Sequence, residues 1–204
     1  MIPELVIPRM TSWAHVPAIP LRRSQDGGAP EQATAVRIAR DDRALFLRFE
    51  CDDRDIWATH TRRDAPLWEE EVVEVFLAPG AGDPREYVEI EVNPLGAIFD
   101  ARVANPDGHR GSMKVDAAWN AAGLVASIDR SIPGTWRATL TIPWAGLCSG
   151  APPPVWRANF FRIERPREGP HEFSSWSKTF ADPPDFHRPS CFGRIVLDDR
   201  NGRE

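Results

Sequence analysis

The sequence predicts an all-β protein folded as a two-sheet antiparallel β-sandwich of the immunoglobulin or jelly-roll kind. Its 20 prolines and 14 glycines divide 204 residues into segments too short for helices of ordinary length. Many of these segments alternate apolar and polar residues, which is the period of a strand with one buried face. Their spacing gives roughly eight to ten strands, as in two-layer sandwiches. A chain of this length can bury one core, so we expect a single domain over residues 1–204.

The first pair of predicted strands forms a hairpin. Residues 34–39 (TAVRIA) and 45–51 (LFLRFEC) flank a polar turn at residues 40–43. Alternation along both segments assigns every second side chain to the core. The inward candidates are Val36, Ile38, Leu45, Leu47 and Phe49.

A second hairpin is predicted at Asn93–Gly96, where Asn, Pro and Gly occupy positions favoured in a type I turn. The turn joins YVEIEV to AIFDARV, and its geometry sets the register of the two strands. The predicted core face carries Val88, Ile90, Val92, Ala97, Phe99 and Ala101. The predicted charged face carries Tyr87, Glu89, Glu91, Ile98, Asp100 and Arg102.

Further strands are predicted at residues 123–130, 134–142, 156–164 and 192–197. Residues 143–147 (PWAGL) are expected to form one helical turn that begins with proline. Residues 20–33 and 165–172 are expected to be loops.

Charge and hydropathy argue against two classes of partner. The formal net charge is -5 and the arginines are scattered among acidic residues, so no nucleic-acid surface is predicted. No apolar run approaches the length of a membrane span, so no membrane partner is expected. Residues 1–13 lack the charged and apolar regions of a signal peptide, which leaves the compartment open.

The cysteines predict neither a disulfide framework nor a zinc site. Cys51, Cys148 and Cys191 are odd in number, far apart in the chain and without CxxC spacing. Buried free thiols are expected. Cys148 with Cys191 is the candidate pair if one bridge forms.

Most of the eight tryptophans have a packing explanation. Trp136 lies on an apolar strand face and is assigned to the core, while the role of Trp57 is left open. Trp68 and Trp176 differ, because polar residues flank them in loops or at strand entries, where binding residues concentrate. Trp13, Trp119, Trp144 and Trp156 lie in apolar or proline-rich segments and are assigned to packing.

Glu74 interrupts an apolar strand, on the face shared with Val72 and Phe76. A buried carboxylate requires a partner, because its desolvation costs several kcal/mol. One interpretation is an internal ion pair with Arg102 or Arg162, and the other is a site in which ligand hydroxyls are the partners. A solvated face and a binding role are both open for Glu89, Glu91 and Asp100.

Four segments together resemble the family 9 carbohydrate-binding modules and their relatives in the DOMON-like β-sandwich group. They are residues 61–96, WRANFFRIE at 156–164, SSWSK around Trp176, and FHRPSCFGRIVL at 186–197. The resemblance covers residues 33–197 and implies the same sandwich fold.

The resemblance also implies a sugar site. In family 9 modules two tryptophans sandwich the end of a glucan chain, and a glutamate six residues after the first contributes hydrogen bonds. Trp68 and Glu74 keep that spacing, and Trp176 fits the second aromatic. Asn159 lies in the segment that resembles the strand supplying an amide, and by parity it faces away from Arg162.

One departure from the family bears on specificity. Where the sugar-binding modules use an arginine on the strand after the glutamate strand, this chain offers Glu89, Glu91 and Asn93. A pyranose is bound by flat aromatic rings against its C–H faces and by polar groups at its hydroxyl rim. The predicted carbohydrate-binding residues are Trp68, Glu74, Glu91, Asn159 and Trp176.

No cofactor is expected to be required, although the family commonly binds calcium in a structural role. The acidic pairs Asp52 with Asp53 and Asp41 with Asp42 offer hard oxygen ligands on loops. Asp52 and Asp53 are the metal candidates carried forward. The family is often extracytoplasmic.

The sequence therefore predicts a non-catalytic protein that binds an oligosaccharide or polysaccharide. One alternative is a haem-binding DOMON-like electron-transfer domain, with Met10 or Met113 as a ligand beside His or Lys. Another is a glycoside hydrolase that uses Glu74 with Glu91 as paired carboxylates. No hydrolase, Walker or dinucleotide motif is present, and His187 is interpreted as a hydrogen-bonded structural histidine.

Overall fold

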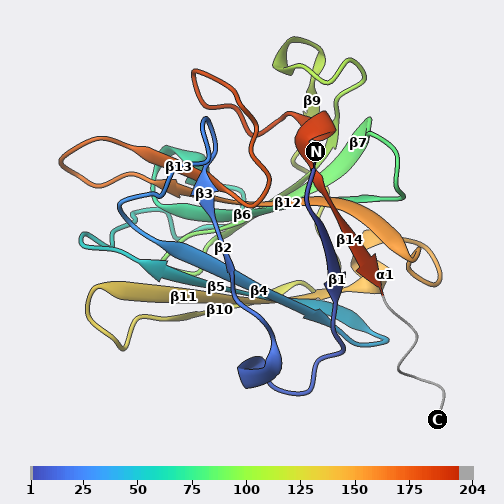
Figure 1. Cartoon of the computed structure of the whole chain (residues 1–204), viewed down its shortest axis with the longest axis horizontal. Helices are drawn as coiled ribbons and strands as arrows, with labels where there is room; N and C mark the ends of the chain where they lie inside the picture. The colour runs from blue at the N-terminus through green and yellow to red at the C-terminus, as the bar shows by residue number, and fades with distance from the viewer. Residues whose placement is uncertain (1, 198–204) are drawn as a thin grey trace.

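The computed structural model describes residues 2–197, which fold into two stacked β-sheets (Figure 1). The five-stranded sheet has the order β10 (Val125–Asp129), β11 (Thr135–Pro143), β5 (Ala44–Asp52), β4 (Thr34–Arg40) and β2 (Ile19–Pro20). The nine-stranded sheet runs β1 (Glu4–Ile7), β14 (Gly193–Leu197), β12 (Val155–Glu164), β6 (Val72–Pro79), β7 (Glu86–Val92), β8 (Ile98–Ala104) and β9 (Lys114–Asp116). Its remaining strands are β13 (Glu172–Ser175), which pairs with β12, and β3 (Arg22–Arg23), which pairs with β13.

Paired strands are antiparallel, apart from β1 and β14, which run parallel. The helical turns of the described chain are short: η1 (Trp13–His15), η2 (Leu67–Glu69), η3 (Arg110–Ser112), α1 (Trp144–Leu147) and η4 (Pro189–Cys191). The two-sheet antiparallel sandwich predicted from the sequence is confirmed. The strands that sequence reasoning missed are short ones, and β3 falls inside the predicted loop at 20–33.

The main core lies between the two sheets. All five inward residues predicted for the first hairpin are buried there, because β4 and β5 pair in the expected register around Ile38 and Leu47. Trp136, Trp144 and Trp156 are buried in the same core, as predicted. Complete burial of one large aliphatic side chain contributes about 1.5 to 3 kcal/mol, so this layer supplies most of the drive to fold.

A second apolar cluster covers the outer face of the nine-stranded sheet. Phe76 from β6 and Phe161 from β12 pack under Phe186 and Phe192, and the rings of Phe161 and Phe186 stack with centroids 4.1 Å apart. In Figure 1 the chain between β13 and β14 passes over this face of the sheet. The central strands are therefore buried on both faces, so polar residues that alternate outward along them do not reach solvent.

The turn at Asn93–Gly96 forms as predicted, but the predicted register was wrong by one residue. The Gly96 amide donates to the Asn93 carbonyl at 2.9 Å, while the Asn93 side-chain oxygen also accepts from the Ala97 amide at 2.9 Å. Ala97 is thereby held in the loop, and Val92 pairs with Ile98. Glu91 pairs with Phe99, so the glutamates of β7 share a face with apolar residues of β8.

The three cysteines are free thiols, so the candidate bridge between Cys148 and Cys191 does not form. Each of these two thiols donates to a backbone carbonyl nearby in the fold, Cys148 to that of Trp144 and Cys191 to that of Thr179. Cys51 is buried in the main core, as expected for a structural cysteine.

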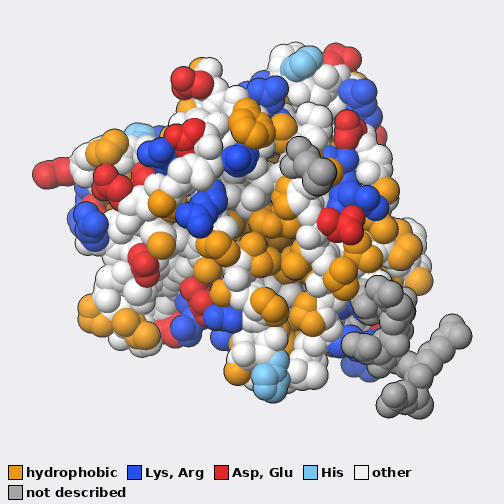
Figure 2. Space-filling view, in the orientation of Figure 1, with side chains coloured by type: hydrophobic (Ala, Val, Ile, Leu, Met, Phe, Trp, Pro, Cys, Tyr) orange, Lys and Arg blue, Asp and Glu red, His pale blue; other side chains and the backbone are white. Residues whose placement is uncertain are grey.

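On the face shown in Figure 2, apolar side chains gather near the centre, between the visible edges of the two sheets. Basic and acidic side chains alternate around them, and no continuous basic strip crosses this face. Within residues 2–197, no helix has the length and apolar character needed to cross a membrane.

Candidate functional site

The candidate site is a pocket of about 420 Å³ on the outer face of the nine-stranded sheet. Aromatic side chains line its wall and three glutamates line its floor; among them are Trp68, Phe99, Phe173, Phe186, Glu74, Glu89 and Glu91. Hollows of about 860 and 1030 Å³ elsewhere on the described surface have no buried carboxylate in their lining. A concave apolar wall around buried ionisable groups is typical of a ligand site.

Strand pairing brings the three glutamates together. Glu74 of β6 lies directly opposite Glu91 of β7. Glu89 precedes Glu91 by two residues in β7 and therefore lies on the same face of the sheet. Their side chains are almost fully buried, and the carboxylate oxygens lie within 4.8 Å of one another. We call Glu74, Glu89 and Glu91 the outer cluster. Glu74 and Glu91 were predicted site residues, and the structure places them in one pocket.

Burial is the main reason why the pKa values in the outer cluster are raised. It raises the pKa of Glu74 and Glu91 well above their ordinary value, and repulsion between the neighbouring carboxylates adds to the rise. Burial also raises the pKa of Glu89, to about 7. The interaction between Glu89 and Glu91 lowers the pKa of Glu89 and raises the pKa of Glu91, so the two carboxyl groups do not titrate independently.

No cation of the described chain neutralises the outer cluster. The ion pair considered for Glu74 is absent, because Arg102 lies over the Trp119 ring and Arg162 faces the other side of the sheet. Within residues 2–197, neither Arg nor Lys lies within 4.0 Å of the three carboxylates. Glu91 belongs to the pocket lining, and its Oε2 atom is buried and receives no hydrogen bond from a described donor.

Charged groups at the pocket rim are engaged elsewhere. Arg110 of η3 pairs with Asp185 at 2.7 Å, and Arg165 donates to the Trp68 carbonyl at 3.1 Å. His187 Nε2 lies 3.7 Å from Glu89, but burial lowers the pKa of His187 to about 4 and keeps the ring neutral. The rim therefore shapes the pocket without filling it with positive charge.

Trp68 occupies the mouth of the pocket on η2, with 41% of its surface exposed. Its ring meets Phe99 edge-on, with centroids 5.2 Å apart. The Trp68 backbone, close to the Glu91 carboxyl group, partly offsets the rise in the pKa of Glu91. An exposed ring held from behind can offer a flat apolar surface to a ligand. The sequence prediction of an exposed Trp68 is confirmed, and its binding role stays a prediction.

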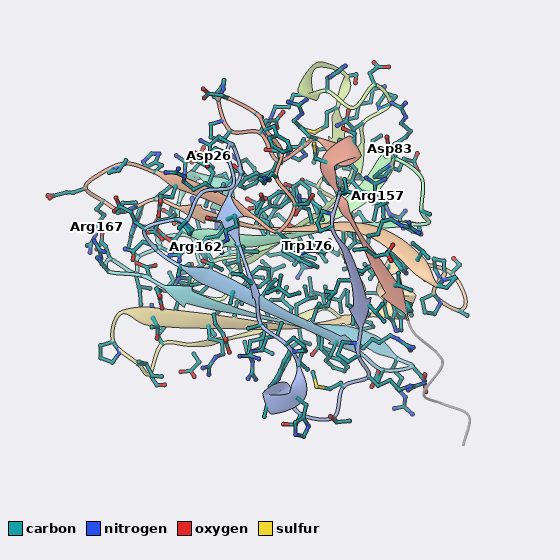
Figure 3. All side chains as sticks on the ribbon, in the orientation of Figure 1. Asp26, Asp83, Arg157, Arg162, Arg167 and Trp176 are labelled. Carbon is teal, nitrogen blue, oxygen red and sulfur yellow. The ribbon has the colours of Figure 1, made fainter. Side chains whose placement is uncertain are left out.

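The structure does not bring Trp176 to this pocket. Trp176 stacks on Phe160 with centroids 5.3 Å apart, and it packs against the main core between the sheets (Figure 3). The side of Gly193 toward Trp176 has no room for a β-carbon, which would lie 2.5 Å from the ring. Trp68 and Trp176 therefore lie on opposite faces of the nine-stranded sheet and do not face each other across one ligand.

Asn159 shares the outer face but its amide is already used. Asn159 Nδ2 donates to the Ser177 carbonyl at 2.8 Å, and Oδ1 accepts from the Ser177 and Phe160 amides at 2.9 and 3.0 Å. The side chain is completely buried and does not line the pocket. Asn159 thus anchors the Ser177 segment, in place of the ligand contact expected from its position. The predicted opposite orientation of Arg162 is confirmed.

Two site residues were overlooked or given another role by the sequence. Phe99 was assigned to the core face, and the one-residue register error hid its contact with Trp68. His187 was interpreted as a structural histidine, and its Nδ1 does lie 2.8 Å from the Tyr87 hydroxyl. Its position in the pocket wall depends on the loop before η4, which carries no local pattern that predicts the contact.

A second group of buried carboxylates, the inner cluster, lies on the opposite side of the sheet. Asp53, Glu71 and Glu164 surround Arg162, whose Nη2 lies 3.1 Å from Asp53 and 3.4 Å from Glu71 and also contacts Glu164. Their oxygens again lie within 4.8 Å of one another. Figure 3 shows Arg162 between the two sheets.

The metal candidates Asp52 and Asp53 separate in the structure. Asp53 joins the inner cluster, where its cationic neighbour is Arg162. Asp52 is exposed at the end of β5, and its carbonyl accepts a hydrogen bond from Arg162 at 2.6 Å. Structural calcium stays a prediction, and these two side chains do not converge on one point to bind it.

The alternative functions find limited support in the geometry. Burial raises the pKa of both Glu74 and Glu91, which disfavours the ionised carboxylate that a glycosidase needs as its nucleophile or base. Met113 lines the pocket beside His187, but Nδ1 of that histidine is bonded to Tyr87 and Nε2 faces Glu89. Met10 lies elsewhere, beside Arg40.

The chain belongs to carbohydrate-binding family 9, whose profile matches residues 21–197. A relative from Arthroderma benhamiae (strain ATCC MYA-4681 / CBS 112371), described as an extracellular protein, is 29% identical over 179 residues, which cover 82% of this chain and 80% of the relative.

Solved structures share the fold at low sequence identity. A Bacteroides uniformis ATCC 8492 protein to which carbohydrate binding has been ascribed superposes with a TM-score of 0.77 at 16% identity, covering 96% of this chain and 99% of that one. A family 9 module from Caldicellulosiruptor kristjanssonii in complex with cellotriose gives a TM-score of 0.70 at 14% identity, covering 98% and 95% of the two chains. The same module with glucose gives 0.69 at 14% identity, covering 98% of each chain.

Proposed function

We propose that this protein binds carbohydrate without cleaving it, and that the sugar occupies the pocket between Trp68 and the outer cluster. The observation that carries the proposal is an exposed tryptophan at the mouth of a pocket whose floor holds unpaired carboxyl groups. Membership of family 9 and the cellotriose and glucose complexes of a structural relative support a sugar as the ligand class.

The chemistry of the pocket suits one sugar ring. The Trp68 and Phe99 rings offer apolar surface to C–H groups, and carboxyl groups on the floor accept or donate hydrogen bonds to hydroxyls. Glu74 and Glu91 are predicted ligand contacts, while Asn159 and Trp176 support the fold around the site.

Replacement of Trp68 by alanine tests the site. We expect Trp68→Ala to weaken sugar binding by about 2 kcal/mol or more, because truncation removes the aromatic surface at the pocket mouth. Isothermal titration with glucose and cello-oligosaccharides measures the change. Trp13→Ala is the matched control, since Trp13 packs against Arg48 of the other sheet. Equal affinity in the wild type and Trp68→Ala would place the sugar elsewhere.

The non-catalytic part of the proposal has its own test. Long incubation with soluble glucans and xylans should release no new reducing ends, because burial raises the pKa of both Glu74 and Glu91 and so disfavours the ionised nucleophile or base that hydrolysis needs. Release of reducing sugar that disappears in Glu74→Gln would instead establish a hydrolase.

A further inference from the structure

The outer cluster is a set of hydrogen-bond acceptors with no cation of its own. Glu74, Glu89 and Glu91 are buried, and the basic side chain that the described chain places within 4.0 Å of them is His187, whose pKa burial lowers to about 4. The inner cluster shows how this same chain neutralises three buried carboxylates when the role is structural, since Arg162 lies among them. The outer cluster opens instead into a pocket, and one of its oxygens, Glu91 Oε2, receives no hydrogen bond from the described chain.

We propose that the pocket is specific for an amino sugar, whose protonated amine sits among Glu74, Glu89 and Glu91 while its ring lies against Trp68. This inference rests on the proposed function and names the class of sugar. It differs from recognition of a neutral sugar, which needs hydrogen bonds and no concentration of carboxylates.

Geometry supports an ammonium group. Its three N–H bonds point to the corners of a tetrahedron, so acceptors about 2.8 Å from the nitrogen lie about 4.6 Å from one another. One oxygen from each glutamate of the outer cluster lies within 4.8 Å of the other two, a separation compatible with a single nitrogen among them. Each N–H then meets one glutamate, and Glu91 Oε2, which is buried, has no hydrogen bond to a described donor that it would have to give up.

The shape of the pocket favours a sugar amine over a bare ion. A volume of about 420 Å³ and a wall of Trp68, Phe99, Phe173 and Phe186 exceed what a metal ion requires. The aromatic rings suit the C–H groups of a pyranose and leave the polar floor for its substituents. A free divalent cation would contact the floor and leave this wall unused.

A bound ammonium group would also lower the raised pKa values of the three glutamates on the pocket floor. Burial and mutual repulsion oppose ionisation of the three carboxyl groups that face one another, and so raise the pKa of each. A cation among them favours the ionised forms, so binding releases protons. The other charged groups facing the floor are Arg110 of η3, with its partner Asp185, and Arg165 after β12.

Titration calorimetry at about pH 6.5 with four ligands tests the inference: glucosamine, glucose, N-acetylglucosamine and cyclohexylamine. We expect glucosamine to bind at least about tenfold more tightly than glucose. Acetylation, which removes the charge, should abolish the gain. Glucosamine binding should release protons, seen as a heat that varies with the ionisation enthalpy of the buffer, and glucose binding should not.

Glu91→Gln should bring the affinities for glucosamine and glucose close to each other, and Glu69→Gln, an exposed glutamate beside Trp68, should keep the difference. Thermal unfolding checks that each variant folds, and Glu74→Gln replaces Glu91→Gln if it does not.

The outcomes separate the two proposals. If glucose binds and glucosamine binds no more tightly, the amino-sugar inference is overturned and the carbohydrate site stands. If no sugar binds, both are overturned. Cyclohexylamine as tight as glucosamine would indicate a site for apolar amines. Calcium chloride that binds to the wild type, fails to bind Glu91→Gln and is required for glucose affinity would assign the floor to a metal ion.

Discussion

The inner and outer clusters contain the same chemical groups in two different settings. Each gathers three buried carboxylates whose oxygens lie within 4.8 Å, and the nine-stranded sheet separates them. The inner cluster encloses Arg162 between the sheets, whereas the outer cluster faces a pocket. The difference teaches that buried acidic residues do not by themselves define a site. What distinguishes a binding floor from a structural network is whether the chain supplies the opposite charge.

Removal of the arginine would break this comparison most strongly. Arg162→Met leaves Asp53, Glu71 and Glu164 buried without their cation, and we expect a loss of about 3 to 5 kcal/mol in the free energy of unfolding. Urea denaturation followed by circular dichroism measures it. Arg167→Met is the control, because Arg167 pairs with Asp55 at an exposed position, near the periphery of Figure 3. A loss below about 1 kcal/mol in Arg162→Met would show that the inner network does not stabilise the fold.

Removal of one carboxyl group from the outer cluster should not lower the free energy of unfolding, in contrast to removal of Arg162 from the inner cluster. Glu91→Gln relieves the proximity of three acids and keeps the side-chain volume, so we expect unfolding free energy to stay the same or rise by about 1 kcal/mol. The same denaturation experiment serves, with Glu69→Gln as the exposed reference. Strong destabilisation by Glu91→Gln would make the outer cluster structural, like the inner one.

The dependence of stability on pH sharpens the comparison further. Carboxyl groups whose pKa is raised in the folded state bind more protons there than in the unfolded chain, so stability falls as pH rises through the folded value. Between about pH 6.5 and 8.5, Glu74 and Glu91 contribute to this fall, and Glu71, with its pKa raised to about 9 by burial, adds to it. Glu89, with its pKa raised to about 7, contributes at the lower end of the window.

His187 affects the lower end of this window. Its pKa is lowered to about 4 in the fold, so the unfolded chain alone binds a proton there, and the ring is largely neutral in both states only above about pH 7.5. The melting temperature of the wild type should decrease as pH rises across the window. In Glu91→Gln the free energy of unfolding should fall less steeply, by up to about 1 kcal/mol per pH unit. Identical slopes for the two proteins would mean that Glu91 is ionised in the fold.

The sandwich was predictable because its signals are local. Turn residues and strict alternation identified the hairpin of β4 and β5 and most of the long strands. The spacing of Trp68 and Glu74 placed both at one pocket for the same reason, since η2 leads directly into β6. Features that depend on a few consecutive residues were within reach of the sequence.

The rest of the site depends on contacts between distant segments. The segment that carries Phe186 and Phe192 covers the outer sheet face, so Glu89 and Glu91 are buried although their alternation is typical of a solvated face. The Asn93 side chain moves the register by one residue. Trp176 follows β13, whose pairing with β12 sends the ring to the core between the sheets. The spacing of residues along the sequence does not predict which face of a sheet a later segment will cover.

Glu74 has a consequence for how reliably the chain folds. Both neighbours of Glu74 in β6, Val73 and Val75, point into the core between the sheets, while Glu74 points to the pocket. A slip of one residue in β6 would turn its carboxyl group into an apolar layer without partners, at a cost of several kcal/mol. A strand of valine and leucine alone would tolerate that error far better. The carboxyl group on the pocket floor therefore also penalises misaligned pairing of β6, before any ligand is present.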